Sequence, residues 1–100
     1  MGVGTHSIIH SGELAGAAAA TQLPDIPCSM ARFKAAYDNV GRVYLGAAGV
    51  TVKDGTTDQT TGFELNAGDD TGWIPVANLN QLYRICDNAG DDLTYMTIDV

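Results

Sequence analysis

The sequence has few basic residues, with 5 Lys and Arg against 12 Asp and Glu, and its formal net charge at pH 7 is −7. Nucleic-acid binding needs a basic footprint, and binding to an anionic membrane surface needs a basic cluster. We therefore expect neither nucleic acid nor a membrane as a partner. The acidic balance fits a protein exposed to solvent, or one whose partner presents basic patches.

Cysteine is also scarce, with only Cys28 and Cys86 in the chain. They form no CxxC motif and no Cys/His cluster with the spacing of a metal site. One disulfide between them is geometrically possible. Both stand in segments of strand composition beside apolar residues, which favours two buried free thiols.

Long apolar runs are missing. The run at residues 14–20 is short, contains Gly16 and has no Lys or Arg before it, so it resembles neither a signal peptide nor a membrane span. We expect the chain to be made and used in a cytosol-like compartment, or to reach the outside by a route other than secretion.

Motifs that carry catalysis or ligand binding are absent from the sequence, which has no phosphate loop, no GxSxG and no HExxH. In a strand His6 and His10 would lie about 13 Å apart, too far for a zinc pair. The polar loop 56–61 lacks the alternating acids of a calcium loop. Asp69 and Asp70 would point opposite ways in an extended segment, so they make no acid–base pair. We expect a protein that is not an enzyme, with no catalytic residue, cofactor or metal ion.

Aromatic residues make up 7% of the chain. Exposed, clustered aromatic rings would suit a sugar ligand, but in a domain this small most aromatic side chains belong to the core. We expect Phe33, Tyr44, Trp73 and Tyr83 in the core. A core position for Trp73 would remove most of the case for glycan binding.

The clearest structural signal in the chain is the stretch 39–46. Val43 and Leu45 alternate there with Arg42 and Tyr44, which is the two-residue period of a half-buried strand. Glycines then mark the exit of this strand. We expect Val43 and Leu45 to face the core.

Other segments have weaker strand signals. Residues 28–37 fit a strand by alternation and also fit a helix by the spacing of their large apolar residues. We interpret them as a strand, because the short turn at 38–39 then makes a hairpin with the strand at 39–46. The alanine-rich stretch 12–23 is interpreted as a small-residue strand or loop. Further short strands are expected at residues 6–10, 50–53, 62–65, 73–76, 82–86 and 93–98.

About seven or eight short strands, separated by Gly, Asn and Asp turns, indicate an all-β fold: an antiparallel β-sandwich or a jelly-roll-like small barrel. One hundred residues make one domain. We divide it into an N-terminal arm or first strand at residues 1–14 and a single β-sandwich domain at residues 15–100.

Five short motifs follow one another along the chain. They are Ala-Thr-x-Leu at residues 20–23, Asn-x-Gly-x-Val-Tyr-x-Gly at 39–46, Gly-Phe-x-Leu-x-x-Gly at 62–68, Ile-Pro-Val at 74–76 and Asn-Leu-x-x-Leu-Tyr at 78–83. In this ordered set, over residues 20–98, the chain resembles a family of small β-sandwich virion proteins of tailed bacteriophages. It departs from the family pattern at loop 56–61, which is longer here.

The resemblance implies a capsid decoration or cement protein, a homotrimer bound to the major capsid protein. It would be assembled in the host cytoplasm and seated on the outer capsid surface at subunit junctions. Binding that favours the expanded shell stabilises it by mass action. The arm at residues 1–14 is expected to add a strand to a neighbour. The candidate interface with the shell or with another subunit consists of His6, Ile8, Ile9, His10 and Leu14.

A second interpretation of the resemblance is a binding module on a head fibre or tail. Such a module would recognise a host surface glycan through Trp73 or Tyr44.

Overall fold

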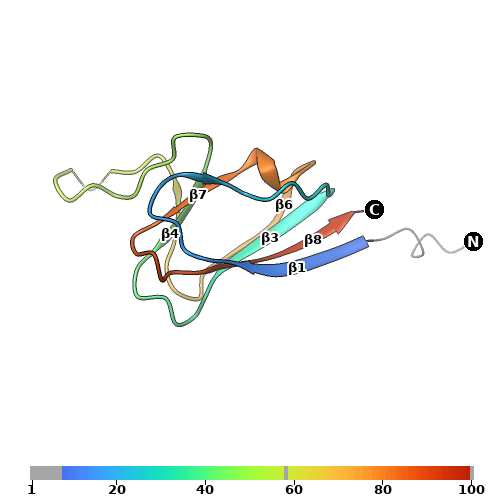
Figure 1. The fold of residues 1–100 in the computed structure, drawn as a ribbon, viewed down its shortest axis with the longest axis horizontal. Helices are drawn as coiled ribbons and strands as arrows, with labels where there is room; N and C mark the ends of the chain where they lie inside the picture. Colours follow the sequence, from blue (N-terminus) through green and yellow to red (C-terminus); the bar gives the residue numbers. More distant parts are fainter. Residues whose placement is uncertain (1–7, 58, 100) are drawn as a thin grey trace, which may run out of the picture.

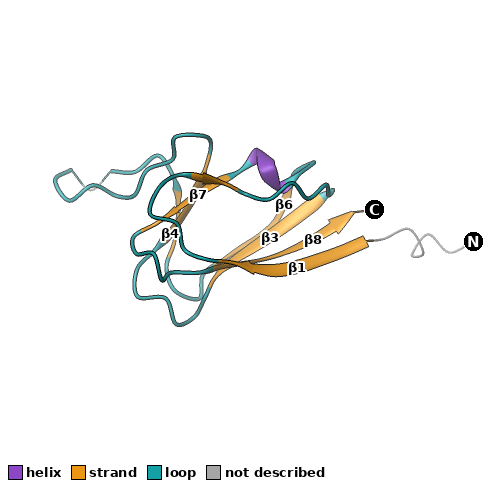
Figure 2. Cartoon of the chain, viewed as in Figure 1, coloured by secondary structure: helices purple, strands orange, loops and turns teal. Residues whose placement is uncertain are grey.

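The computed structural model describes residues 8–57 and 59–99, which form eight β-strands and one short 3-10 helix (Figure 1). The elements are β1 (Ile8–Leu14), β2 (Thr21–Gln22), β3 (Met30–Ala35), β4 (Val43–Gly46), β5 (Phe63–Leu65), β6 (Asp70–Pro75), η2 (Leu79–Gln81), β7 (Tyr83–Cys86) and β8 (Leu93–Asp99). Figure 2 shows that strands and loops account for nearly all of the described chain.

The strands form two antiparallel four-stranded sheets, in the orders β1-β8-β3-β6 and β2-β7-β4-β5. Apart from β4 and β5, strands that follow one another in sequence lie in different sheets. This strand order defines a jelly roll, a sandwich of two Greek keys. The expected all-β sandwich is therefore confirmed, and its topology is the jelly-roll alternative.

The core lies between the two sheets. In β3, Ala31, Phe33 and Ala35 are fully buried while the residues between them are exposed, so residues 30–35 are a strand and not a helix. The opposite sheet contributes Val43, as expected. The buried cluster comprises Leu23, Cys28, Ala31, Phe33, Ala35, Val43, Leu45, Leu65, Leu79, Cys86 and Leu93.

The expected hairpin between β3 and β4 is wrong. The two strands lie in different sheets, and the turn at 38–39 carries the chain from one sheet to the other. Asn39 ties this turn to the β7–β8 turn: its Nδ2 donates to the Asp92 carbonyl (2.9 Å), and its Oδ1 accepts from the Asp92 backbone N–H (2.7 Å). The turn is therefore held by a partner that is distant in sequence, which local turn chemistry does not reveal.

Tyr44 is fully buried, as expected for an aromatic core residue, but it does not lie between the two sheets. Tyr44 points to the outer side of its sheet, where Val50 lies beside it. The strand expected at residues 50–53 is wrong, because these residues form a loop that returns over Gly62. Gly62 permits this approach, since a Cβ there would lie 2.7 Å from Val50 Cγ2 and 2.8 Å from Tyr44 Cβ. The Tyr44 hydroxyl donates a hydrogen bond to Asp87 Oδ1 (3.0 Å).

Both cysteines are buried free thiols, as expected, and no disulfide joins them. Cys28 lies just before β3 rather than within a strand, and its Sγ donates to the Val76 carbonyl at 3.4 Å. Burial raises the pKa of both thiols above the ordinary value, and Asp99 adds to the rise for Cys28.

Candidate binding face

The outer side of the β1-β8-β3-β6 sheet carries three rows of side chains, each crossing all four strands in register. The first row is apolar and consists of Ile9, Ile98, Met30 and Pro75. The middle row is mixed and consists of Ser11, Met96, Arg32 and Trp73. The third row is polar and charged and consists of Glu13, Thr94, Lys34 and Asp70. We call these twelve residues the outer face.

Several large apolar side chains of the outer face are open to solvent. Ile9 is 63% exposed, Met96 44%, and Met30 and Trp73 36% each. Scattered exposed apolar residues are ordinary, but a contiguous patch with a polar border marks an interaction site. The outer face therefore has the character of a docking surface, apolar at one end and charged at the other.

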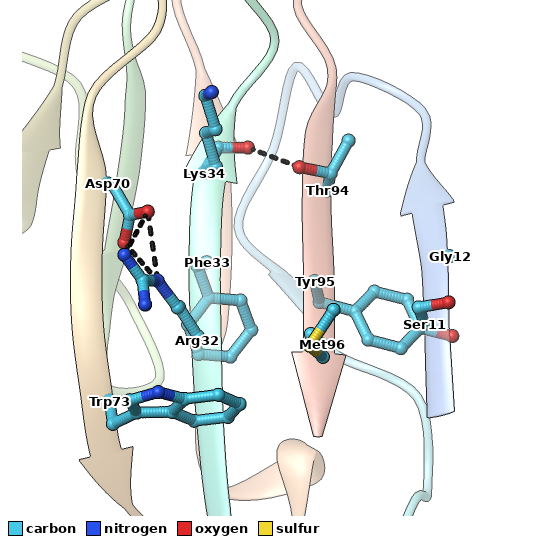
Figure 3. A pocket seen from close by; sticks show the side chains of 10 residues that line it. All are labelled: Ser11, Gly12, Arg32, Phe33, Lys34, Asp70, Trp73, Thr94, Tyr95 and Met96. Carbon is cyan, nitrogen blue, oxygen red and sulfur yellow. Dashed lines mark hydrogen bonds and ion pairs between the residues drawn. The ribbon is translucent and has the colours of Figure 1, made fainter. Parts of the chain in front are cut away.

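A hollow of about 520 Å³ lies at the centre of the outer face, and Ser11, Met96, Arg32 and Trp73 all line it (Figure 3). The Arg32 guanidinium binds the Asp70 carboxylate, with Nε 2.9 Å from both carboxylate oxygens. Its centre also lies 5.9 Å from the centroid of the Trp73 ring, within cation–π range. The hollow thus combines an aromatic plane with a fixed cation and a fixed anion.

A β-bulge brings these groups together. Arg32 pairs with Trp73 and Lys34 pairs with Asp70, so two residues of β6 stand opposite Phe33 alone. In a regular strand, residues 70 and 73 would point to opposite faces. Gly72 adopts a φ of +72° at the bulge, a conformation that glycine reaches without strain.

Side chains at the bulge accept hydrogen bonds from backbone N–H groups that the interrupted strand pairing leaves without a ladder partner. The Phe33 N–H donates to Thr71 Oγ1 (3.1 Å), and the Gly72 N–H donates to Asp70 Oδ1 (2.7 Å). The hydrogen bond from Gly72, together with that from Arg32, holds the pKa of Asp70 below its ordinary value despite some desolvation. Asp70 is therefore an anion at neutral pH.

The interface residues expected from the sequence do not share one surface. Ile9 belongs to the outer face, whereas Ile8 and His10 point to the opposite side of β1 and Leu14 packs against the core. His6 lies outside the described residues. Residues 8–14 are the first strand of the sheet, because β1 pairs with β8 of the same chain along all seven of its residues.

Sequence reasoning missed the groups at the centre of the outer face. Trp73 was expected in the core, and the structure places it on the surface because the bulge and the pairing with Arg32 turn it outward. Phe33 and Tyr44 are buried, which confirms two of the four aromatic core residues, and Tyr83 is half-buried. The alternation in residues 28–37 predicted the strand that carries Arg32, but nothing local identified the partners of this side chain.

A second carboxylate, that of Asp91, is 1% exposed and accepts four hydrogen bonds of 2.9–3.1 Å. The donors are the backbone N–H groups of Val40, Gly41 and Asn88 and the side-chain amide of Asn88. Burial raises the pKa of this carboxyl, but the hydrogen bonds outweigh it, so its pKa lies below the ordinary value. All these donors belong to the β3–β4 turn or the β7–β8 turn, which Asp91 holds together. We therefore assign Asp91 a structural role.

Residues 8–57 and 59–99 contain no group of three or more His, Cys, Asp or Glu side chains arranged to hold a metal ion. The same residues contain no helix with the length and apolar character needed to cross a membrane.

Comparisons with protein-family models, with curated proteins and with solved structures found no match to this chain.

Proposed function

We propose that this chain is a structural protein of a tailed-bacteriophage particle that decorates the outer capsid surface. In this proposal the outer face docks on the major capsid protein where shell subunits meet. The contact stabilises the shell by mass action and involves no catalytic step.

The observation that carries the proposal is the register of the outer face. A continuous apolar row of four side chains, Ile9, Ile98, Met30 and Pro75, crosses the sheet. The charged row lies four residues away along β1, β8 and β3 and, because of the bulge, five residues away along β6. A hydrophobic strip bordered by charges suits a protein partner, since the strip provides burial and the charges set the orientation.

Two further points support the proposal. The ordered motifs of residues 20–98 resemble those of small virion proteins. Jelly rolls occur in viral capsid proteins and also in lectins, although a shared fold does not by itself establish a function.

The test is co-sedimentation of the full-length chain with undecorated, expanded capsids of the same phage. Met30→Glu places a charge in the apolar row and should weaken binding by at least about tenfold. Val40→Glu is the matched control, because Val40 is 93% exposed and lies outside the outer face; it should bind like the unmodified chain.

Decorated capsids should also rupture at a higher temperature than undecorated capsids. Absence of the chain from purified virions would overturn the proposal. So would a Met30→Glu variant that folds and binds as tightly as the Val40→Glu control.

A second candidate function, glycan recognition, is favoured by one observation. Trp73 is exposed at the hollow beside the Arg32–Asp70 ion pair, and a sugar ring can stack on an indole while its hydroxyls bond to charged groups. Tyr44, the other ring considered for this role, is fully buried and offers no platform.

Tryptophan fluorescence tests this candidate directly, because the chain has a single tryptophan. A bound host-surface oligosaccharide should shift the emission of Trp73 in a saturable way, and Asp70→Asn should weaken binding by roughly tenfold. Asp69→Asn is the control, since Asp69 bonds to the Asn66 backbone instead. An emission that no host oligosaccharide changes would eliminate glycan recognition and leave shell docking as the function.

A further inference from the structure

The β1-β8-β3-β6 sheet ends at β1, whose far edge has no partner strand among the described residues. Exposed sheet edges offer unpaired N–H and C=O groups to another strand, and natural proteins usually protect them. The four edges of this sandwich differ in how well they are protected.

Three of the four edges carry a protective feature. β6 has Pro75, which lacks an N–H, and the bulge around Gly72. In the second sheet the edge strands are short: β2 has two residues and β5 has three. An incoming strand would find little regular backbone to pair with at these edges.

The β1 edge has none of these features. It is seven residues long, contains no proline and pairs with β8 without a register shift. Its side chains are exposed except for Leu14. It contains no Lys, Arg or Asp, and its single Glu, Glu13, stands next to the end. Long, regular and nearly uncharged edges of this kind support strand addition.

We propose that β1 pairs antiparallel with β1 of a second copy, joining two sheets into one eight-stranded sheet. A two-fold axis perpendicular to the sheet keeps each side chain on its own face, so opposed residues are an even number of positions apart. The register centred on Ser11 pairs all seven residues of Ile8–Leu14. Registers centred on a neighbouring residue pair five.

The Ser11-centred register is also complementary in chemistry. Ile8 stands opposite Leu14 of the second copy, which makes an apolar pair. Ile9 stands opposite Glu13, whose aliphatic stem can pack against the isoleucine side chain. His10 stands opposite Gly12, which has no side chain to oppose it. No two like charges face one another, so the acidic net charge of the chain does not oppose this contact locally.

The pairing has a consequence for the outer face. Because Ser11 meets Ser11 of the second copy, the middle row continues across the axis, with the same residues in reverse order. The two Trp73 residues would then lie on one surface, seven strand spacings or roughly 34 Å apart. Pairing of identical edges joins two copies, whereas the resemblance to virion proteins implies three.

The first test is the mass of the full-length chain in solution, by light scattering over about 1 µM to 0.5 mM, the range of weak to moderate self-association. We expect a concentration-dependent approach to twice the chain mass of 10.5 kDa. Ser11→Lys sets two ammonium groups opposite each other and should raise the dimer dissociation constant roughly three- to tenfold. Ser11→Thr, a neutral change at the same site, should leave the constant nearly unchanged.

Cross-linking tests the register separately. Under oxidising conditions Ser11→Cys should form an intermolecular disulfide, because directly opposed residues lie about 4.5–5.5 Å apart. Glu13→Cys is the control on the same face, since its two copies would be about 13 Å apart along the strands. Circular dichroism should show that both variants keep the fold.

A chain that stays monomeric over the whole range would overturn the inference, as would a trimer that Ser11→Lys does not disturb. Equal cross-linking of Ser11→Cys and Glu13→Cys would also overturn it. The test involves no capsid or glycan, so its failure would leave the proposed function standing, and failure of capsid binding would leave this inference standing.

Discussion

Asp91 shows how a single side chain joins two parts of the chain that are distant in sequence. Its carboxylate lies between the β3–β4 turn and the β7–β8 turn and accepts from Val40, Gly41 and Asn88. Hydrogen bonds to a charged group stabilise more than neutral ones, and a buried donor that loses its partner carries a desolvation cost. The turn that begins the β4 strand therefore depends on a residue 50 positions away from Gly41.

Asp91→Asn should destabilise the fold by about 2–4 kcal/mol, because an amide has one oxygen and turns an N–H₂ group toward the existing donors. Chemical denaturation measures the change. Asp38→Asn is the control, since Asp38 is exposed in the neighbouring turn, and it should stay within about 0.5 kcal/mol of the unmodified chain. Equal stabilities of the two variants would contradict the structural role of Asp91.

The same carboxylate makes stability depend on pH. Its pKa in the folded chain lies below the unfolded value, so the stabilisation is fully present above the unfolded pKa and is lost as the pH falls through the folded pKa. The free energy of unfolding should therefore decrease below about pH 4. Asp91→Asn should show a shallower decrease, and parallel pH profiles for the two proteins would be the contrary result.

Thr97 offers an opposite case, in which a polar group costs stability. Its side chain is fully buried, and its hydroxyl has no hydrogen-bond partner among the described residues. Thr97→Val keeps the β-branched shape and removes the unpaired hydroxyl, so it should stabilise the fold by about 1 kcal/mol. Thermal unfolding measures this, and a loss of stability would show that the hydroxyl is bonded in solution.

At the scale of elements, β4 is buried on both sides, which is unusual for a strand in a two-layer sandwich. Val43 and Leu45 face the other sheet, while Tyr44 faces outward beneath Val50. The segment between β4 and β5 extends away from the sheets and returns (Figure 1), and Val50 lies on its first part. This segment therefore has a packing role in addition to connecting two strands.

Val50→Ala should destabilise the fold by about 1–2 kcal/mol, because it removes two methyl groups from a buried site over Tyr44. Val40→Ala is the same chemical change at a side chain that is 93% exposed, and it should cost less than about 0.5 kcal/mol. Urea denaturation of both variants gives the comparison. If both changes cost the same, Val50 does not cover Tyr44.

At the scale of the whole molecule, packing and hydrogen bonds hold the two sheets together, and no disulfide joins Cys28 and Cys86. Cys28 and Cys86 are both free and buried, and burial raises the pKa of each thiol. A buried thiol with a raised pKa forms little of the thiolate that reacts. The stability of the sandwich therefore does not depend on the redox state of its surroundings.

A reducing agent should consequently leave the melting temperature unchanged. A thiol reagent should label both cysteines in denaturant and react roughly a hundredfold more slowly with the native chain, because labelling requires local or global opening. A melting temperature that falls by several degrees on reduction would indicate a disulfide in place of the free thiols.

The sequence by itself determined the features that depend on local periodicity. Alternation in β3 identified Ala31, Phe33 and Ala35 as one side of a strand, and the apolar setting of the two cysteines indicated that they are buried and free. The number of short strands and their turns indicated an all-β sandwich. Each of these inferences holds because a strand's two sides follow from residue order alone.

Only the tertiary structure decided which strands pair and what covers them. A short turn at 38–39 suits a hairpin as well as a crossover between sheets, and contacts with Asp91 and Asp92 select the crossover. Trp73 reaches the surface beside Asp70 because the bulge opposite Phe33 adds one residue to β6. The extra residue places Asp70 and Trp73 on the same side of the strand. Tyr44 is buried where its hydroxyl donates to Asp87, 43 positions further along the chain. The physical reason is the same in each case, since the deciding partner lies far along the chain, where no local pattern records it.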